Sequence, residues 1–177
     1  MSNRKNFLII LDIDNTLIDT TFFPVSYKTP SDPLTHSYPR PYLDCFMNYL
    51  LSNYYVGIWT AALPMWKQRV LNTTLKPYSK YFLFAWSGDQ VCFDQSDNII
   101  KPLKLVWSAF PNFGPHNTLF IDDTLNTGCL NPDNHLHIKP FIVTNSKKDN
   151  ELFKIFSVLE STKPIPSLIK EKYNKLK

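Results

Sequence analysis

The sequence has few cysteines, and none of them belongs to a CxxC pair. The three cysteines, Cys45, Cys92 and Cys129, lie far apart along the chain. This spacing argues against a disulfide framework of the kind found in small secreted domains, and against a cysteine-based zinc site. The cysteine content therefore favours a reducing, intracellular compartment, either the cytoplasm or the nucleus.

Long apolar runs are also absent. The run Phe7–Leu11 is short, is followed at once by Asp12, and has no small-residue cleavage site behind it. We therefore expect no secretory signal and no membrane-spanning segment. Internal repeats and low-complexity tracts are missing as well.

Charge and glycine are sparse, whereas proline is frequent. Charged residues make up 19% of the chain, and four glycines stand against 14 prolines. With 177 residues, 44% of them hydrophobic, this is the composition of one globular domain and not of a disordered or fibrous protein. The net charge of +4 is scattered and only mildly favours acidic substrates. We expect the domain to occupy residues 1–160, followed by a solvated basic tail at 161–177.

The rest of the chain is organised around its first apolar run. Phe7–Leu11 is uninterrupted, which is typical of a strand buried on both faces of a parallel sheet. Asp12 and Asp14 follow where this strand should end, and ligands of open α/β sheets bind at the carboxyl ends of strands. Two buried carboxylates this close require a cationic partner, because an unpaired one would take up a proton.

The later pattern predicts an α/β fold in which helices flank the parallel sheet. Further apolar runs predict buried strands, and apolar residues at helical spacing predict helices. The expected strands are 55–59, 118–121 and a short one formed by Ile138 and 141–143; the expected helices are 41–53, 64–75, 103–110 and 152–159.

Two segments should interrupt this alternation. Residues 19–40 are rich in proline and aromatic residues without any period, so we expect a long loop over the strand ends. Residues 81–86 and 91–93 flank Ser87–Gln90, which predicts a small β-hairpin insert without a large cap. The aromatic residues of 81–86 should pack within this hairpin, and the alternative is that they form a platform that binds proline in a peptide.

Polar residues follow each of three predicted strands. Thr60 comes directly after the second, and Asp122 and Asp123 end the third, with Lys101 at the head of an intervening helix. Since the ends of parallel strands meet, these groups should converge with Asp12 and Asp14. Carboxylate oxygens suit Mg²⁺, which takes few protein ligands beside a substrate phosphate.

This set of residues predicts phosphoryl transfer to a carboxylate. Asp12 is the candidate nucleophile that attacks phosphorus, and Asp14 would protonate the leaving oxygen and then activate water. Thr60 and Lys101 would bind the phosphoryl oxygens.

Several assignments stay open on the residues alone. Thr60 could merely cap the next helix, and Lys104 could replace Lys101 on spacing. Thr16 could hold the turn that carries Asp12 and Asp14, called the acidic turn below, by bonding to the backbone. His135 and His137 alternate as on an edge strand, and a zinc site there is a weak alternative.

The order DIDNT, WTAA, KPL and IDD resembles the haloacid dehalogenase superfamily of aspartate-nucleophile phosphatases. RPYLDCF, IWTAALPMW, IKPLKLVWSAF, NTLFIDD and LNPDNHLHIKPF narrow the resemblance, over 7–159, to the FCP/SCP group and to the phosphatase domains of its ubiquitin-like-domain-containing CTD phosphatases.

The resemblance implies a residue for each role. It makes Asp12 the nucleophile, Asp14 the acid and base, and Thr60 and Lys101 the phosphate ligands, in preference to Lys104. Mg²⁺ would be held by Asp12, the backbone carbonyl of Asp14, and Asp123. Asp122 would support Lys101 or a water on the ion.

The resemblance also implies a phosphorylated protein or peptide as substrate, with phosphoserine, phosphothreonine or phosphotyrosine as the reacting group. Residues 20–38 and 81–98 depart from the pattern, so no individual substrate is implied. The alternatives are a nucleic-acid or small-molecule phosphomonoesterase, a receiver-like signalling domain, and a catalytically silent binding module with the same fold.

Overall fold

The computed structural model describes residues 5–26 and 28–177. Its centre is a five-stranded sheet in the order β5-β4-β1-β8-β9, in which every neighbouring pair is parallel. The strands are β1 (Leu8–Leu11), β4 (Tyr55–Trp59), β5 (Phe84–Trp86), β8 (Thr118–Asp122) and β9 (His135–His137). The predicted parallel α/β sheet is confirmed, with β1 in the middle.

The apolar run of β1 is buried on both faces, as expected. Ile9 and Leu11 join a core cluster with residues of α1 and α4, whereas Leu8 and Ile10 join a second cluster with residues of α3. Alternate side chains of a strand point to opposite faces, so an unbroken apolar run supplies both cores.

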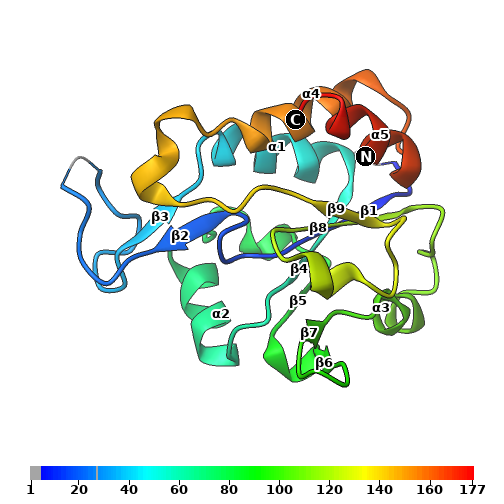
Figure 1. Cartoon of the computed structure of the whole chain (residues 1–177), viewed down its shortest axis with the longest axis horizontal. Coiled ribbons are helices and arrows are strands. Elements are labelled where there is room, and N and C mark those ends of the chain that lie inside the picture. The colour runs from blue at the N-terminus through cyan, green and yellow to red at the C-terminus, as the bar shows by residue number, and fades with distance from the viewer. Residues whose placement is uncertain (1–4, 27) are drawn as a thin grey trace.

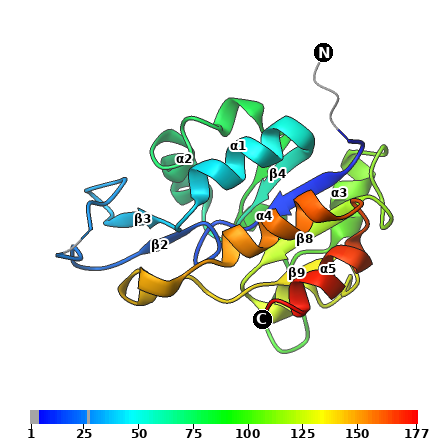
Figure 2. The ribbon, with the colours of Figure 1, turned by 90° about the horizontal axis from the view of Figure 1, so that it is seen from above.

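The helices form layers on the two sides of this sheet. Figure 1 shows α1 (Leu43–Asn53), α4 (Glu151–Ser161) and α5 (Pro166–Asn174) on one side, and α2 (Pro64–Asn72) and α3 (Leu103–Ala109) on the other. In Figure 2, α4 lies between α1 and α5. The described residues also form short 3₁₀ helices at η1 (Ser79–Tyr81), η2 (Gly88–Gln90), η3 (Leu125–Gly128) and η4 (Val143–Lys148).

The four helices predicted from the sequence, α1 to α4, are confirmed, with ends that differ by a few residues. None of the helices in the described part of the chain has the length and apolarity that a membrane span requires.

The segment expected as a long loop contains an antiparallel pair of strands. β2 (Ile18–Thr20) pairs with β3 (Ser37–Pro39), and this flap projects at the left of Figure 1. Tyr38 is buried against Phe141 and Val143. The stabilising contacts thus come from residues about a hundred positions away, which a local pattern cannot show.

The predicted hairpin is in a different place. β5 is a strand of the main sheet, parallel to β4, and the hairpin pairs β6 (Cys92–Phe93) with β7 (Ile99–Ile100). Gly57 makes room for β5, because a Cβ on Gly57 would lie 2.4 Å from the Phe84 ring. Phe84 and Trp86 of β5 pack against Trp59 and Phe110 and belong to the core, whereas Tyr81 of η1 is half exposed.

The strand expected at Ile138 and 141–143 is wrong. The chain forms the edge strand β9 just before it, and this confirms the alternating edge position predicted for His135 and His137. Ile138 and Phe141 are buried in the irregular segment that follows.

The basic segment from residue 161 is not a solvated end. It forms α5, whose Ile169 and Tyr173 are fully buried in the main core, and the Tyr173 hydroxyl donates to Glu151. The frequent lysines of this segment make its apolar residues inconspicuous in the sequence, although α5 buries those residues in the core. The boundary placed between residues 160 and 161 stays a prediction.

Replacement of Ile169 by alanine should therefore destabilise the whole domain. We expect the free energy of unfolding to fall by about 2 to 5 kcal/mol, because the change leaves a cavity under α5. Urea unfolding followed by circular dichroism measures this loss. Ser167→Ala, at an exposed position of the same helix, is the control and should change stability by less than about 0.5 kcal/mol. Equal behaviour of the two variants would mean that α5 does not belong to the core.

Candidate active site

The register of the sheet brings the predicted polar residues to one edge. Leu11 is level with Ile58 of β4 and with Ile121 of β8. Asp12, Thr60 and Asp122 therefore lie together at the carboxyl ends of three neighbouring strands. This confirms the expected convergence of the strand ends.

Lys101 lies between two of the carboxylates. Its Nζ is 2.6 Å from Asp12 Oδ1 and 2.7 Å from Asp122 Oδ2, and all three side chains are at least 92% buried. The backbone N–H of Lys101 donates to the Thr127 carbonyl, which fixes the start of α3 under the strand ends. Lys104, the alternative on spacing, is exposed.

Burial and charge oppose each other in this group. Burial raises the pKa of Asp12 well above its usual range, and the Lys101 ammonium counteracts that shift. Burial lowers the pKa of Lys101, but Asp12 and Asp122 outweigh it and the net shift is upward. The lysine therefore stays charged, as a buried ammonium does when carboxylates surround it.

Asp14 has different partners from Asp12. Its Oδ1 accepts a hydrogen bond from Trp66 Nε1 at 2.8 Å, and its Oδ2 accepts one from the Thr60 hydroxyl at 3.1 Å. Burial is the largest cause of the raised pKa of Asp14. A carboxyl group of this kind holds a proton more readily than an exposed aspartate, as a general acid must.

Thr60 does not cap the following helix. Its Oγ1 accepts the Ala62 N–H at 3.0 Å, and the N-cap of α2 is Leu63, without a side-chain bond. The Thr60 hydroxyl thus holds the turn after β4 and points at Asp14.

The carboxylates at this edge also fit a divalent cation. One oxygen each of Asp12, Asp122 and Asp123 lies within 4.8 Å of the others, and all-oxygen donors of this kind suit Mg²⁺. The Asp14 side chain is not in this group, and ligation by its backbone carbonyl stays a prediction. Burial raises the pKa of Asp123.

Thr16 bonds a carboxylate and not the backbone, contrary to one expectation. Its hydroxyl donates to Asp123 Oδ1 at 3.3 Å, which ties the turn after β1 to the end of β8. A His137 ring nitrogen contacts the Asp123 backbone oxygen at 2.9 Å on the other side. Asp123 is thus held from two directions.

A cavity of about 130 Å³ opens over these groups, with Asp12, Asp14, Thr60, Lys101 and Asp122 in its lining. The candidate nucleophile, the candidate acid and both candidate phosphate ligands share this space. The cavity is small enough to suit a single phosphate group.

The sequence did not single out Arg40. Its guanidinium is fully buried, bonds both oxygens of Asp149 at 2.9 Å, and donates to the Thr16 carbonyl at 3.0 Å. A further N–H donates to the Lys139 carbonyl at 2.7 Å. Arg40 therefore stabilises the acidic turn through a hydrogen bond to its backbone. Its only signal was its place in the RPYLDCF motif, because backbone carbonyl partners leave no pattern in a sequence.

Trp66 is a second residue that the sequence did not single out, and its indole bond to Asp14 spans 52 positions. The two histidines of β9 contribute no metal group: in the part of the chain that the structure describes, the only cluster of potential ligands is the aspartate group above. His135 is buried and stacks on Phe120.

Comparison with known proteins gives a consistent result. The model of the family "NLI interacting factor-like phosphatase" matches residues 7–168. A CTD phosphatase-like protein of Invertebrate iridescent virus 3 is 31% identical over 186 residues, which cover 92% of this chain and 100% of that protein. The ubiquitin-like domain-containing CTD phosphatase of Arabidopsis thaliana is 32% identical over 166 residues, which cover 86% of this chain and 45% of that protein.

Solved structures share the fold. The fission yeast RNA polymerase II CTD phosphatase Fcp1, bound to beryllium fluoride, is similar with a TM-score of 0.54 and 18% identity, over 96% of this chain and 55% of that one. The predicted α/β architecture of the haloacid dehalogenase type is confirmed, and its small hairpin lies at 92–100 and not at 81–93.

Removal of the buried ammonium should leave two carboxylates without a counter-charge. We expect Lys101→Met to lower the free energy of unfolding by about 3 to 5 kcal/mol at pH 7, because one partner of a buried ion pair is lost. Lys104→Met is the matched control three residues away and should cost less than about 0.5 kcal/mol. Chemical denaturation at pH 7 measures the free energy of unfolding of both variants and of the wild type. A Lys101→Met protein as stable as the wild type at pH 7 would show that the ion pairs of Lys101 with Asp12 and Asp122 do not stabilise the fold.

The buried His135 should make folding sensitive to acid. Burial lowers the pKa of His135 from 6.5 to about 4, so the unfolded chain takes up the proton first as the pH falls. The neutral His135 contributes its full share of stability above pH 6.5. The free energy of unfolding should then fall by about 3 kcal/mol as the pH decreases towards 4. His135→Phe replaces the imidazole with a phenyl ring that cannot titrate. Between pH 7 and pH 4, the free energy of unfolding of the variant should therefore rise by about 3 kcal/mol relative to that of the wild type.

Denaturation curves across this pH range test the prediction. His116→Gln, at an exposed histidine, should follow the wild type. Parallel curves for His135→Phe and wild type would contradict it.

Proposed function

Because the chain belongs to the NLI interacting factor-like phosphatase family, we propose that it is a Mg²⁺-dependent protein phosphatase that forms an aspartyl-phosphate intermediate. The observation that carries this proposal is the Lys101 ammonium held between Asp12 and Asp122, beside the hydrogen-bonded Asp14. Family membership makes the chain a phosphatase of the haloacid dehalogenase type, and the arrangement of these four side chains supports the mechanism.

A phosphorylated protein segment is the proposed substrate. The relatives from the iridescent virus and from Arabidopsis thaliana carry names of CTD phosphatases. The chain spans less than half the length of the plant protein, so the shared part is the phosphatase domain. We propose phosphoserine, phosphothreonine or phosphotyrosine as the group that reacts.

Asp12, Asp123 and the backbone carbonyl of Asp14 are the proposed ligands of Mg²⁺. The ion, when bound, would neutralise charge on the phosphoryl oxygens and on the clustered aspartates. The oxygen-only donor set at the strand ends supports this assignment.

In the first proposed step, a carboxylate oxygen of Asp12 forms a bond to phosphorus and the bond from phosphorus to the substrate oxygen breaks. Asp14 gives its proton to that leaving oxygen. The raised pKa of Asp14 supports this role, because the carboxyl group then keeps its proton to a higher pH than an exposed aspartate does.

In the second step, Asp14 takes a proton from a water molecule, and the water oxygen bonds to phosphorus. The bond from phosphorus to Asp12 breaks, which releases phosphate and restores the carboxylate. Asp14 ends the cycle protonated, as it began.

The neighbouring residues keep these groups in place. Thr60 and Lys101 are the proposed donors to the phosphoryl oxygens, and Asp122 orients Lys101. Thr16 holds Asp123. Positioned donors of this kind supply most of the acceleration that acid and base catalysis cannot.

The mechanism predicts that Asp12→Asn abolishes turnover. We expect the wild type to hydrolyse p-nitrophenyl phosphate and phosphopeptides with Mg²⁺ but not with EDTA, and the variant to lose at least about 10⁴-fold in kcat because the nucleophile is gone. Asp133→Asn, at an exposed carboxylate, should keep wild-type activity.

Phosphopeptides labelled at phosphorus give a direct second measurement. Acid quenching during turnover should trap label on the wild-type protein and none on Asp12→Asn. Turnover that survives in Asp12→Asn would remove the aspartyl-phosphate mechanism, and turnover in EDTA would remove the metal requirement.

A further inference from the structure

A second, larger cavity lies beside the site, between the exit of β9 and the start of α4. It measures about 590 Å³, and Lys139, Lys148, Lys154 and Lys177 contribute to its lining together with Asp149 and Glu151. We call it the lysine pocket. Its lining shares no residue with that of the cavity at the strand ends.

The two acids of the lysine pocket are already neutralised. Asp149 accepts two hydrogen bonds from the buried Arg40. Glu151 accepts from Lys154 at 2.9 Å and from the Tyr173 hydroxyl. Neither carboxylate has a charge left to balance the remaining lysines.

The ammonium groups of Lys139 and Lys148 therefore stay uncompensated. Among the residues that the structure describes, no carboxylate pairs with either of them. The Lys177 ammonium donates to the His137 carbonyl, which brings the last residue of the chain to this pocket. Like charges in one concave site attract an anion, because field lines concentrate there.

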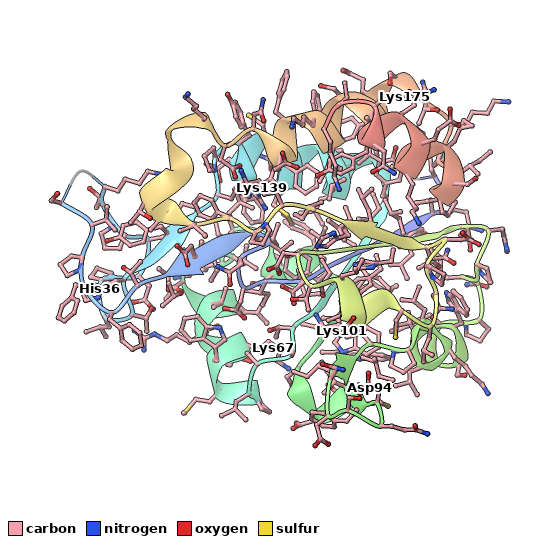
Figure 3. All side chains as sticks on the ribbon, viewed as in Figure 1. His36, Lys67, Asp94, Lys101, Lys139 and Lys175 are labelled. Carbon is pink, nitrogen blue, oxygen red and sulfur yellow. The ribbon has the colours of Figure 1, made fainter. Side chains whose placement is uncertain are left out.

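The lysine pocket adjoins the acidic turn. His137, part of its lining, contacts the backbone of Asp123 through its ring. Arg40 links the Lys139 carbonyl to that of Thr16. In Figure 3, Lys139 is labelled towards α1 and α4, and Lys101 on the opposite side of the central strands. An anion at Lys139 would therefore be a different group from the phosphate that reacts at Asp12.

We propose that the lysine pocket binds a second phosphate group of the same protein segment whose first phosphorylated residue reacts at Asp12. The inference rests on the proposed function and adds a substrate class to it: segments phosphorylated at two or more residues. A phosphate carries about −1.5 to −2 charges at neutral pH, so it matches several ammonium groups where one carboxylate would not.

A nucleic-acid backbone fits this pocket less well. No Phe, Tyr or Trp is found among its described lining residues, so bases would have no aromatic surface on which to stack. The site is a pocket closed by the start of α4 and by Lys177, which suits one or two phosphates.

The test compares peptides with one and with two phosphoserines, the second at separations from two to eight residues. We expect one separation at which kcat/KM of the wild type exceeds that for the singly phosphorylated peptide by about 10-fold, as two or three new charge pairs allow. Lys139→Glu combined with Lys148→Glu should abolish this preference. The same variant should hydrolyse the singly phosphorylated peptide and p-nitrophenyl phosphate at the wild-type rate.

The matched control reverses two lysines elsewhere. Lys76→Glu with Lys80→Glu, both exposed near α2, changes the net charge equally and should keep the preference. Both double variants alter exposed side chains, and their melting temperatures verify that they fold. Loss of the preference in both would reduce the effect to net charge and overturn the proposal.

The remaining outcomes separate this proposal from the proposed function. Absence of any preference in a wild type that hydrolyses p-nitrophenyl phosphate overturns the lysine pocket alone. Absence of turnover on every phosphoester overturns the proposed function, and the second phosphate with it. A single-stranded oligonucleotide that inhibits the wild type more strongly than the doubly phosphorylated peptide, and no longer inhibits the lysine variant, would assign the pocket to nucleic acid instead.

Discussion

The ion pairs of Lys101 with Asp12 and Asp122 are the constraint on which the rest of the structure depends. Three aspartates at one sheet edge repel one another, and burial raises the pKa of Asp12 and of Asp123. The lysine cannot come from the strands themselves, since the carboxylates occupy their ends. It comes from the β6–β7 hairpin and the start of α3, and the bond from its N–H to Thr127 sets its position. The hairpin thus delivers the counter-charge.

Arg40 is the corresponding cation on the opposite side of the acidic turn. It is as buried as Lys101, but its partners are the carbonyls of Thr16 and Lys139 and the carboxylate of Asp149. Its planar guanidinium can bond all of them at once, which an ammonium could not do with the same geometry. Two cations therefore hold the acidic turn between them, one at the carboxylates and the other at the backbone.

The centre of the fold and the place of Asp12, Thr60 and Asp122 at one sheet edge could be predicted from the sequence because each has a local signal, whereas Lys101 was chosen over Lys104 only by the family resemblance. Apolar runs followed by Asp12, Thr60 and Asp122 mark both a buried strand and the position of its end. β2, β3 and α5 have no such signal, since their burial depends on residues far along the chain: Tyr38 packs under Phe141, and Tyr173 bonds Glu151. Arg40 and Trp66 were missed for the same reason, because their partners lie 24 to 109 positions away.

The two carboxylates of the acidic turn differ in environment although they are two residues apart. Burial raises the pKa of both, but Asp12 has an ammonium at 2.6 Å, whereas the hydrogen-bond donors to Asp14 are the neutral groups of Trp66 and Thr60. A full positive charge favours the ionised form far more than neutral donors do. The Lys101 ammonium therefore opposes the effect of burial on Asp12 with a full charge, whereas only neutral donors oppose it at the hydrogen bonds of Asp14. Exchanging the roles would place the nucleophile at the carboxylate whose hydrogen-bond donors are both neutral, away from the ammonium that can stabilise its charge.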